Sequence, residues 1–282
     1  MRRAFSILFA IIFIGLRAAG AEVFYAAPPT DNWYQSPLFR LTAFSAGQSD
    51  SMLLECGGEV MMIDGGTAAY ADDLISALNE KKIDHFKYLF GTHYHEDHIG
   101  GLIALMEAGF SVGEYLHPYA PGSIYANVNH RRAMQVVKEK EIFQRQISHM
   151  ETLYLGEAEI TLLRHDGGIS ANGRSTVAHI RFGSASILLT ADIIGDTQTW
   201  LMANVSEEYL DADILKAPHH GVSAMVGDFI DAVSPEMIFF NNERSDAREG
   251  IRQAEKAGLP FLCTGDATIV LETDGTDWYV VQ

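Results

Sequence analysis

The sequence predicts an α/β fold in which two mixed β-sheets are covered by helices. Short runs of apolar and β-branched residues, typical of strands, alternate along the chain with amphipathic helical patterns. Several extended runs follow one another with only a turn between them, as in β-hairpins. The chain has 282 residues, 48% hydrophobic and 20% charged, enough for one large domain or two small ones. We expect one domain.

The individual elements can be placed in chain order. We expect extended segments at 39–44, 52–55, 60–63, 88–91, 115–117, 160–164, 177–182, 186–190, 214–217, 237–240, 260–263, 268–272 and 277–281. We expect helices at 71–82, 99–108, 130–145, 197–204, 224–233 and 247–257. Strands that alternate with helices, together with hairpins, fit two mixed sheets with helices packed on them.

The first residues have the pattern of a secretory signal peptide. Met-Arg-Arg is followed by an almost entirely apolar run at 4–16 and by small residues at Ala19 and Ala21. A buried helix or an uncleaved anchor would be the alternatives, but the apolar run is shorter than the ~20 residues of a membrane span. We therefore expect a signal peptide at 1–21 cleaved after Ala21, an arm at 22–37 and a domain at 38–282. The mature protein would be secreted or extracytoplasmic, without a stable membrane span.

The chain is strongly acidic, with a formal charge of −17. Cleavage after Ala21 would remove three arginines and no acid, which takes the charge to −20. An acidic protein repels polyanions at long range and gains little from phosphate neutralisation. We therefore expect no tight non-specific binding of nucleic acid, although bound metal ions would still allow phosphodiester chemistry.

The segment 92–101 reads Thr-His-Tyr-His-Glu-Asp-His-Ile-Gly-Gly and follows an apolar run at 86–90. His93 and His95 are two residues apart, so in extended backbone they point the same way and can hold one ion. Asp97 and His98 come where the chain turns into a helix and can face a second ion. A run of solvent-exposed loop histidines is the simpler alternative. It would not explain why the run follows a buried strand and ends in two glycines.

Four further segments place metal-binding residue types at the ends of predicted strands. Asp64 follows 61–63, His165 follows 160–164, and Asp192 follows 186–191. A carboxylate that ends a buried apolar strand is costly without a cation or hydrogen-bond donors, which favours a ligand role for Asp192. The pair His219 and His220 follows 214–218.

The pattern His-x-His-x-Asp-His resembles the signature of the metallo-β-lactamase superfamily. That family has a four-layered αββα sandwich fold and consists of metal-dependent hydrolases, and the other segments match its motifs in the right order. The turn at 46–51, Asn172–Ser175 and the segment 264–275 resemble one branch, the extracytoplasmic hydrolase domain of competence DNA-uptake proteins and its free-standing relatives. The chain departs from that branch at Ser45, Ser49 and Val222.

The resemblance implies a site with two divalent ions, Zn²⁺ by preference, with Mn²⁺ or Fe²⁺ as alternatives. The implied metal ligands are His93, His95, Asp97, His98, His165, Asp192 and His219, with Asp64 supporting the metal loop from behind. One residue of the pair 219–220 would be a ligand. We assign that role to His219, nearer the strand end, and make His220 a proton shuttle or phosphate donor. Asp97 would also orient the nucleophile and accept its proton. For His165 a ligand role and a solvent-facing role both stay open.

The function implied is that of an exported hydrolase with a metal-bound hydroxide as nucleophile. Branch resemblance favours phosphodiester bonds in a small-molecule or polymer substrate, as in a phosphodiesterase or nuclease. A lactamase or lactonase that opens a cyclic amide or ester is the alternative enzyme. A metal-binding domain that recognises a surface partner without catalysis is the alternative outside enzymes.

Overall fold

The computed structural model describes residues 22–24, 38–119 and 126–281. The predicted signal peptide at 1–21 and residues 25–37 of the predicted arm lie outside these ranges. Within them, no helix is both long and apolar enough to cross a membrane.

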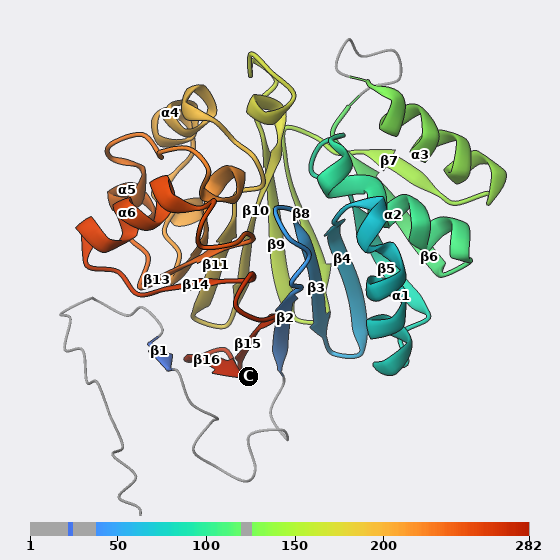
Figure 1. Cartoon of the computed structure of the whole chain (residues 1–282), viewed down its shortest axis with the longest axis horizontal. Coiled ribbons are helices and arrows are strands. Elements are labelled where there is room, and N and C mark those ends of the chain that lie inside the picture. Colours follow the sequence, from blue (N-terminus) through green and yellow to red (C-terminus); the bar gives the residue numbers. More distant parts are fainter. Residues whose placement is uncertain (1–21, 25–37, 120–125, 282) are drawn as a thin grey trace, which may run out of the picture.

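Two β-sheets form the centre of the molecule (Figure 1). The first has nine strands in the order β1-β16-β15-β2-β3-β4-β5-β6-β7, and the second has seven in the order β14-β13-β12-β11-β10-β9-β8. The first sheet consists of β1 (Val23–Phe24), β2 (Phe39–Ala43), β3 (Ser51–Cys56), β4 (Glu59–Gly65), β5 (His85–Phe90), β6 (Ser111–His117), β7 (Gln144–Gln146), β15 (Ile269–Thr273) and β16 (Trp278–Val281). The second consists of β8 (Met150–Leu155), β9 (Ala158–Arg164), β10 (Thr176–Phe182), β11 (Ala185–Leu189), β12 (Ile214–Lys216), β13 (Met237–Phe240) and β14 (Phe261–Cys263).

Helices cover the outer face of each sheet (Figure 1). The first sheet carries α1 (Ala71–Glu80), α2 (Glu96–Ala108) and α3 (Val128–Glu139), and the second carries α4 (Gly195–Asn204), α5 (Phe229–Val233) and α6 (Arg248–Ala257). The order of layers is therefore helix, sheet, sheet, helix. The predicted αββα fold class is confirmed.

Alternating side chains on the central strands build this layering. On β3, Met52 and Leu54 belong to the buried cluster between the two sheets, whereas Leu53 packs with the helices outside. On β11, Ile187 faces the inter-sheet cluster and Leu188 packs in the cluster under α4–α6. Successive strand residues point to opposite faces, so a strand that is apolar at every position lies in a sheet buried on both sides.

Parallel pairing brings the ends of several strands to one edge of the molecule. In the first sheet β4 pairs parallel with β5, with Ile63 opposite Phe90. In the second sheet β11, β12 and β13 are parallel neighbours, with Lys216 between Leu189 and Phe239. Asp64 lies at the end of β4, and the segments after the other strands carry the loop 92–98, Asp192 and the pair 219–220. The fold therefore gathers them at the junction of the two sheets.

Two predicted helices are clearly shorter in the structure. The helix expected at 130–145 ends at Glu139, because Glu141 adopts a left-handed conformation with φ 55° and Gln144–Gln146 then forms β7 beside β6. The helix expected at 224–233 is shortened to Phe229–Val233. The edge strands β7 and β8 were not predicted, because their side chains are mostly exposed or only partly buried and lack an apolar pattern.

Candidate metal centre

The loop that carries the histidine cluster is fixed by Asp64. This residue ends β4 in a left-handed conformation with φ 53°, and its carboxylate accepts hydrogen bonds from Thr92 N at 2.9 Å and Thr92 Oγ1 at 2.6 Å. Helix α2 begins at Glu96, three residues before the predicted start. Asp97 and His98 therefore lie in its first turn, where the rigid helix sets the direction of both side chains.

His93 and His95 point toward each other and toward Asp192. His93 Nε2 lies 3.0 Å from His95 Nδ1 and 3.8 Å from Asp192 Oδ2. The three residues offer ligand atoms close enough together to share one metal ion. The two-residue spacing thus has the effect that the sequence predicted, although the backbone at 92–94 is bent rather than part of a strand.

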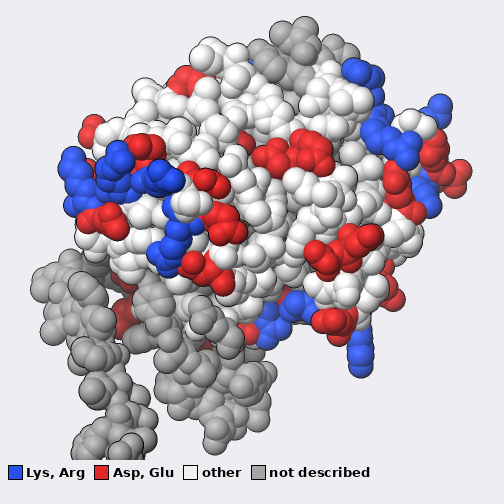
Figure 2. Space-filling view, in the orientation of Figure 1, with Lys and Arg blue, Asp and Glu red and all other residues white. Residues whose placement is uncertain are grey.

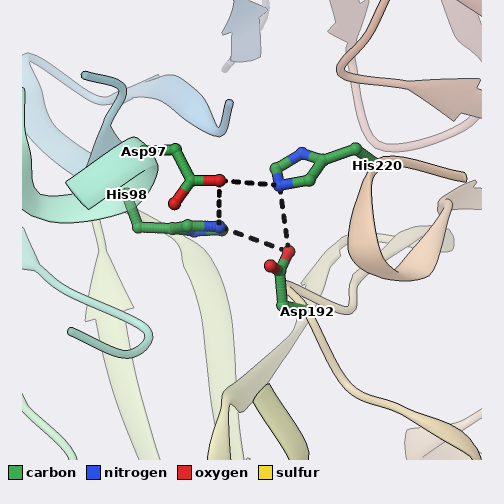
Figure 3. Close-up of side chains that lie close together, drawn as sticks. All are labelled: Asp97, His98, Asp192 and His220. Atoms are coloured by element: carbon green, nitrogen blue, oxygen red, sulfur yellow. Dashed lines mark ion pairs between the residues drawn. The ribbon is translucent and has the colours of Figure 1, made fainter. Parts of the chain in front are cut away.

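A second group consists of Asp97, His98, Asp192 and His220 (Figure 3). Asp192 Oδ1 lies 3.2 Å from His98 Nε2 and 3.3 Å from His220 Nε2. Asp97 Oδ2 lies 3.4 Å from His220 Nε2. Asp192 belongs to both groups, so its carboxylate has the position of a bridge between two ions.

The polar atoms at the centre of the second group have no hydrogen-bond partner among the described residues. These atoms are His98 Nε2, His220 Nε2 and Asp192 Oδ1, and all of them are buried. A buried polar atom left without a partner costs free energy. Imidazole nitrogens and a carboxylate oxygen converging on one point are ligands that divalent transition metals bind. The residues therefore fit a metal ion.

Several buried carboxylates at the site need positive charge close to them. Asp50, Asp64 and Asp192 are at most 1% exposed, and Lys216 is a fully buried cation beside them. Burial acts to lower the pKa of His220, but the carboxylates of Asp192 and Asp50 raise it to about 10. Without a cation, the carboxylates therefore hold a proton on this ring. A metal ion would replace that proton, which makes metal binding proton-releasing.

Carboxylates behind the two rings of the second group orient them. His98 Nδ1 donates to Asp64 Oδ2 at 2.7 Å, and His220 Nδ1 lies 3.1 Å from Asp50 Oδ1. A partner on Nδ1 directs Nε2 toward the metal position. The sequence identifies Asp64 in this role but assigns none to Asp50, although the turn at 46–51 carries part of the family resemblance.

The paired histidines diverge because both have left-handed backbone conformations. His219 has φ 49° and ψ 47°, and His220 has φ 54° and ψ 13°. His220 is fully buried in the second group. The His219 side chain is 28% exposed, with Nε2 3.8 Å from Asp192 Oδ2 and 3.2 Å from Asn172 Nδ2. The structure thus places His220 among the possible ligands of the second group and His219 at the more open side of the site, beside Asp192.

The family-model comparison matches residues 45–233 to the metallo-beta-lactamase superfamily, more than half of the chain. The chain belongs to the metallo-beta-lactamase superfamily. Proteins of this superfamily bind divalent metals, in keeping with the groups around Asp192. No curated protein sequence matches the chain.

Solved structures share this superfamily fold at low sequence identity. YhfI from Bacillus subtilis is 12% identical, with a TM-score of 0.54 over 80% of this chain and 96% of that protein. A diphosphatase from the PhnP family is 17% identical, with a TM-score of 0.50 over 84% and 97%. CmlA, a diiron beta-hydroxylase from Streptomyces venezuelae, is 14% identical, with a TM-score of 0.50 over 80% of this chain. This chain spans about half of CmlA, covering 52% of its length.

Two predicted ligands, His165 and His219, join none of the metal-binding groups among the described residues; His219 still faces Asp192, but His165 packs against other residues. Its ring stacks on Trp200 with 4.5 Å between centroids and an interplanar angle of 12°. Its Nδ1 lies 3.4 Å from Thr197 Oγ1. In the described part of the chain it joins none of the metal-binding groups. A solvent-side role for His165 therefore fits its position better than a ligand role.

Proposed function

We propose that this protein is an exported metal-dependent hydrolase that cleaves phosphodiester bonds. The observation that carries the hydrolase proposal is the buried set of partnerless ligand atoms converging on Asp192. Export is supported by the signal-peptide pattern at 1–21.

Two ions can be assigned to the residues present. His93, His95 and Asp192 would hold the first, with His219 Nε2 next to them, and Asp97, His98, Asp192 and His220 would hold the second. Burial lowers the pKa of both His93 and His219, which keeps these rings neutral and able to bind metal. Bound ions would supply Lewis-acid polarisation of the scissile group and acidify an attacking water.

Asp97 is placed to move a proton. Its side chain is 30% exposed, so it reaches the open side of the site, while Asp192 is almost fully buried. Burial acts to raise the pKa of Asp97, but His220 and His98 outweigh it and hold the pKa below its usual value. The carboxylate is therefore ionised at neutral pH and can orient the nucleophile and accept its proton.

Two side chains at the open side favour a phosphodiester over a cyclic amide or ester. Asn172 Nδ2 and His219 Nε2 lie 3.2 Å apart beside Asp192. With His219 Nε2 facing the first ion, the Asn172 amide can donate to a non-bridging oxygen of a phosphoryl group whose other oxygens face the ions.

The surface charge favours a small phosphodiester over a long nucleic acid. On the face in Figure 2, Lys and Arg gather near the positions of α6 and α3, while acidic side chains spread between them. A polyanion would gain little attraction from such a surface.

A substrate panel tests the proposal. The chain 22–282, loaded in turn with Zn²⁺, Mn²⁺ and Fe²⁺, is offered bis-p-nitrophenyl phosphate, single-stranded DNA, nitrocefin and a lactone. We expect bis-p-nitrophenyl phosphate to be hydrolysed. His220→Asn should lower kcat/KM about 100-fold or more, because a ligand is lost. The kcat/KM of the matched variant His165→Asn should stay within about twofold of the parent value, because the His165 ring lies outside the metal groups.

Each other outcome has a defined meaning. Turnover of nitrocefin or the lactone alone would show that the enzyme is a lactamase or lactonase. Fewer than one bound transition metal per chain would contradict both the hydrolase proposal and the alternative of a metal-binding surface domain. For export, the protein recovered outside the cytoplasm should begin at Glu22, and a product retaining residues 1–21 would contradict cleavage after Ala21.

A further inference from the structure

A buried lysine lies directly behind the metal centre. Lys216 ends β12 and is fully buried, and its Nζ lies 2.6 Å from Asp50 Oδ2. The same ammonium donates a hydrogen bond to the carbonyl oxygen of Ala191 at 2.9 Å. Moving a lysine and an aspartate together from water into the protein interior is costly. Proteins in which hydrophobic residues of similar volume replace such a buried ion pair are often equally stable. A bare contribution to stability is therefore a weak explanation for the pair.

Asp50 connects this lysine to a metal-binding ring. Its Oδ1 accepts a hydrogen bond from Asn241 Nδ2 at 3.1 Å and lies 3.1 Å from His220 Nδ1. Lys216 on Oδ2 and Asn241 on Oδ1 together fix the carboxylate plane. The position of His220 is fixed from the backbone side too, because Asn242 Nδ2 donates to the His220 carbonyl oxygen at 3.2 Å.

Ala191 connects the lysine to the bridging carboxylate. Ala191 precedes Asp192 and has a left-handed conformation with φ 47°, which a residue with a Cβ rarely adopts. Its carbonyl oxygen accepts hydrogen bonds from both Lys216 Nζ and His219 N, each at 2.9 Å. The Lys216 ammonium group therefore contacts both Asp50, which faces His220, and Ala191, which precedes Asp192. Asp192 and His220 follow different strands.

We propose that Asp50 and Lys216 are a positioning pair that turns His220 Nε2 toward Asp97 and Asp192 and thereby sets the affinity for the second metal ion. Asp50 faces His220 Nδ1 as an ion-pair partner at 3.1 Å, on the side of the ring where Asp64 hydrogen-bonds His98, and Lys216 holds Asp50 and the turn before Asp192 in one arrangement. The inference rests on the two-ion site proposed above.

Paired substitutions separate positioning from stability. Asp50→Asn or Lys216→Met alone leaves one buried charge without its ion-pair partner, so the metal-free protein should melt at a much lower temperature. The double variant Asp50→Asn/Lys216→Met removes both charges with little change in shape. Its metal-free form should melt close to the parent. Its Kd for the second Zn²⁺, titrated against a competing chelator, should rise about tenfold.

A second double variant, Asp50→Val/Lys216→Met, removes the oxygen that faces His220 Nδ1 as well. We expect its second-ion Kd to rise about 100-fold, while the Kd for the first Zn²⁺ should rise much less, because His93 and His95 do not contact the pair and only the shared Asp192 is affected. Arg40→Met/Glu272→Gln is the matched control. It removes an ion pair with a buried carboxylate, 2.5 Å between Arg40 Nη2 and Glu272 Oε1, outside the metal groups. This control should bind two ions with the parent affinities.

Unchanged second-ion affinity in the Asp50→Asn/Lys216→Met variant would overturn the inference and make the pair purely structural. That result would be decisive even if the valine variant does not fold. A parent protein that binds fewer than two ions would instead contradict the two-ion site itself, so the two failures are distinguishable.

Discussion

His130 shows how single residues outside the ligand set support the metal loop. Its ring packs on Tyr94 with 4.1 Å between centroids, and Tyr94 stands between the ligands His93 and His95. Asn127 and Asn129 both donate hydrogen bonds to the Tyr94 carbonyl oxygen, at 2.5 and 3.3 Å. Residues at the start of α3 therefore fix the backbone between two metal ligands.

The protonation of His130 should make stability depend on pH. Burial, with smaller effects of His117 and Arg131, lowers the pKa of His130 from 6.5 to about 4. Because an unfolded histidine takes up its proton near pH 6.5 and the folded one only near pH 4, the neutral ring stabilises the fold above pH 6.5. This contribution is lost as the pH falls from 6.5 to about 4.

The measurement is urea denaturation of the metal-free parent and of His130→Gln at several pH values. The difference in free energy of unfolding between them should be constant above pH 7 and shrink toward pH 4. A difference that stays constant across this range would show that His130 titrates normally in the folded protein.

The site residues differ in how well the sequence alone predicts their positions. His93, His95, Asp97 and His98 share one short run, so their spacing alone predicts that they meet. Asp50 and Asn241 meet across 191 residues, and their contact depends on how the strands of two sheets are arranged. The order of His219 and His220 follows from two left-handed backbone conformations, which residue types other than glycine do not reveal in advance.

At the scale of elements, the close packing of α2 against β4 fixes the positions of Asp97 and His98 in the first turn of the helix. Gly101 N donates to Gly66 O at 2.9 Å, and a Cβ added at Gly101 would lie 2.0 Å from Gly65 O. The helix can therefore pass the end of β4 only because position 101 has no side chain. This explains the Gly100-Gly101 pair that follows the histidine cluster.

Gly101→Ala should push α2 away from β4 and displace both ligands at its first turn. We expect a loss of about 1–3 kcal/mol in the free energy of unfolding, as for other overpacked sites, and weaker binding of the second Zn²⁺. Gly227→Ala is the control, because a Cβ there has no atom within 4 Å. Parent-like stability and Zn²⁺ affinity in Gly101→Ala would mean that the helix has room to shift.

Most strands and helices follow from local patterns, whereas elements defined by their partners do not. Strands such as β11 and β13 are apolar at nearly every position and were predicted within a few residues. Strand β7 is Gln-Arg-Gln and exists because Tyr115–His117 on β6 offer it backbone partners. The end of α3 is similarly set by the start of that pairing.

At the scale of the whole molecule, each metal group joins the two sheets. His93, His95, Asp97 and His98 follow β5 in the first sheet, and Asp192 and His220 follow β11 and β12 in the second. Bound ions would therefore connect the halves of the sandwich at the edge where carboxylates gather. Without them, the negative charge of Asp192 is compensated mainly by His98 and His220, whose Nε2 atoms lie 3.2 and 3.3 Å from its Oδ1.

Removal of metal should destabilise the whole fold. At free Zn²⁺ one thousand times the Kd of a site, binding adds about 4 kcal/mol of stability for that site. Chelation should therefore lower Tm by several degrees, measured by calorimetry, and re-addition of Zn²⁺ should restore it. Asp192→Asn is the control, since it weakens both groups and should make Tm insensitive to chelator. An equal response of parent and variant would contradict a stabilising ion at Asp192.

Asp192 is shared between two metal groups, and each group has residues from both sheets. Folding must therefore come before metal binding, since high-affinity loading of these two positions has to wait until the sandwich has closed. A chain exported in unfolded form, in line with the export proposed above, would leave the cytoplasm without its ions. The metal it carries would then be decided by whichever divalent cations are present where the chain folds.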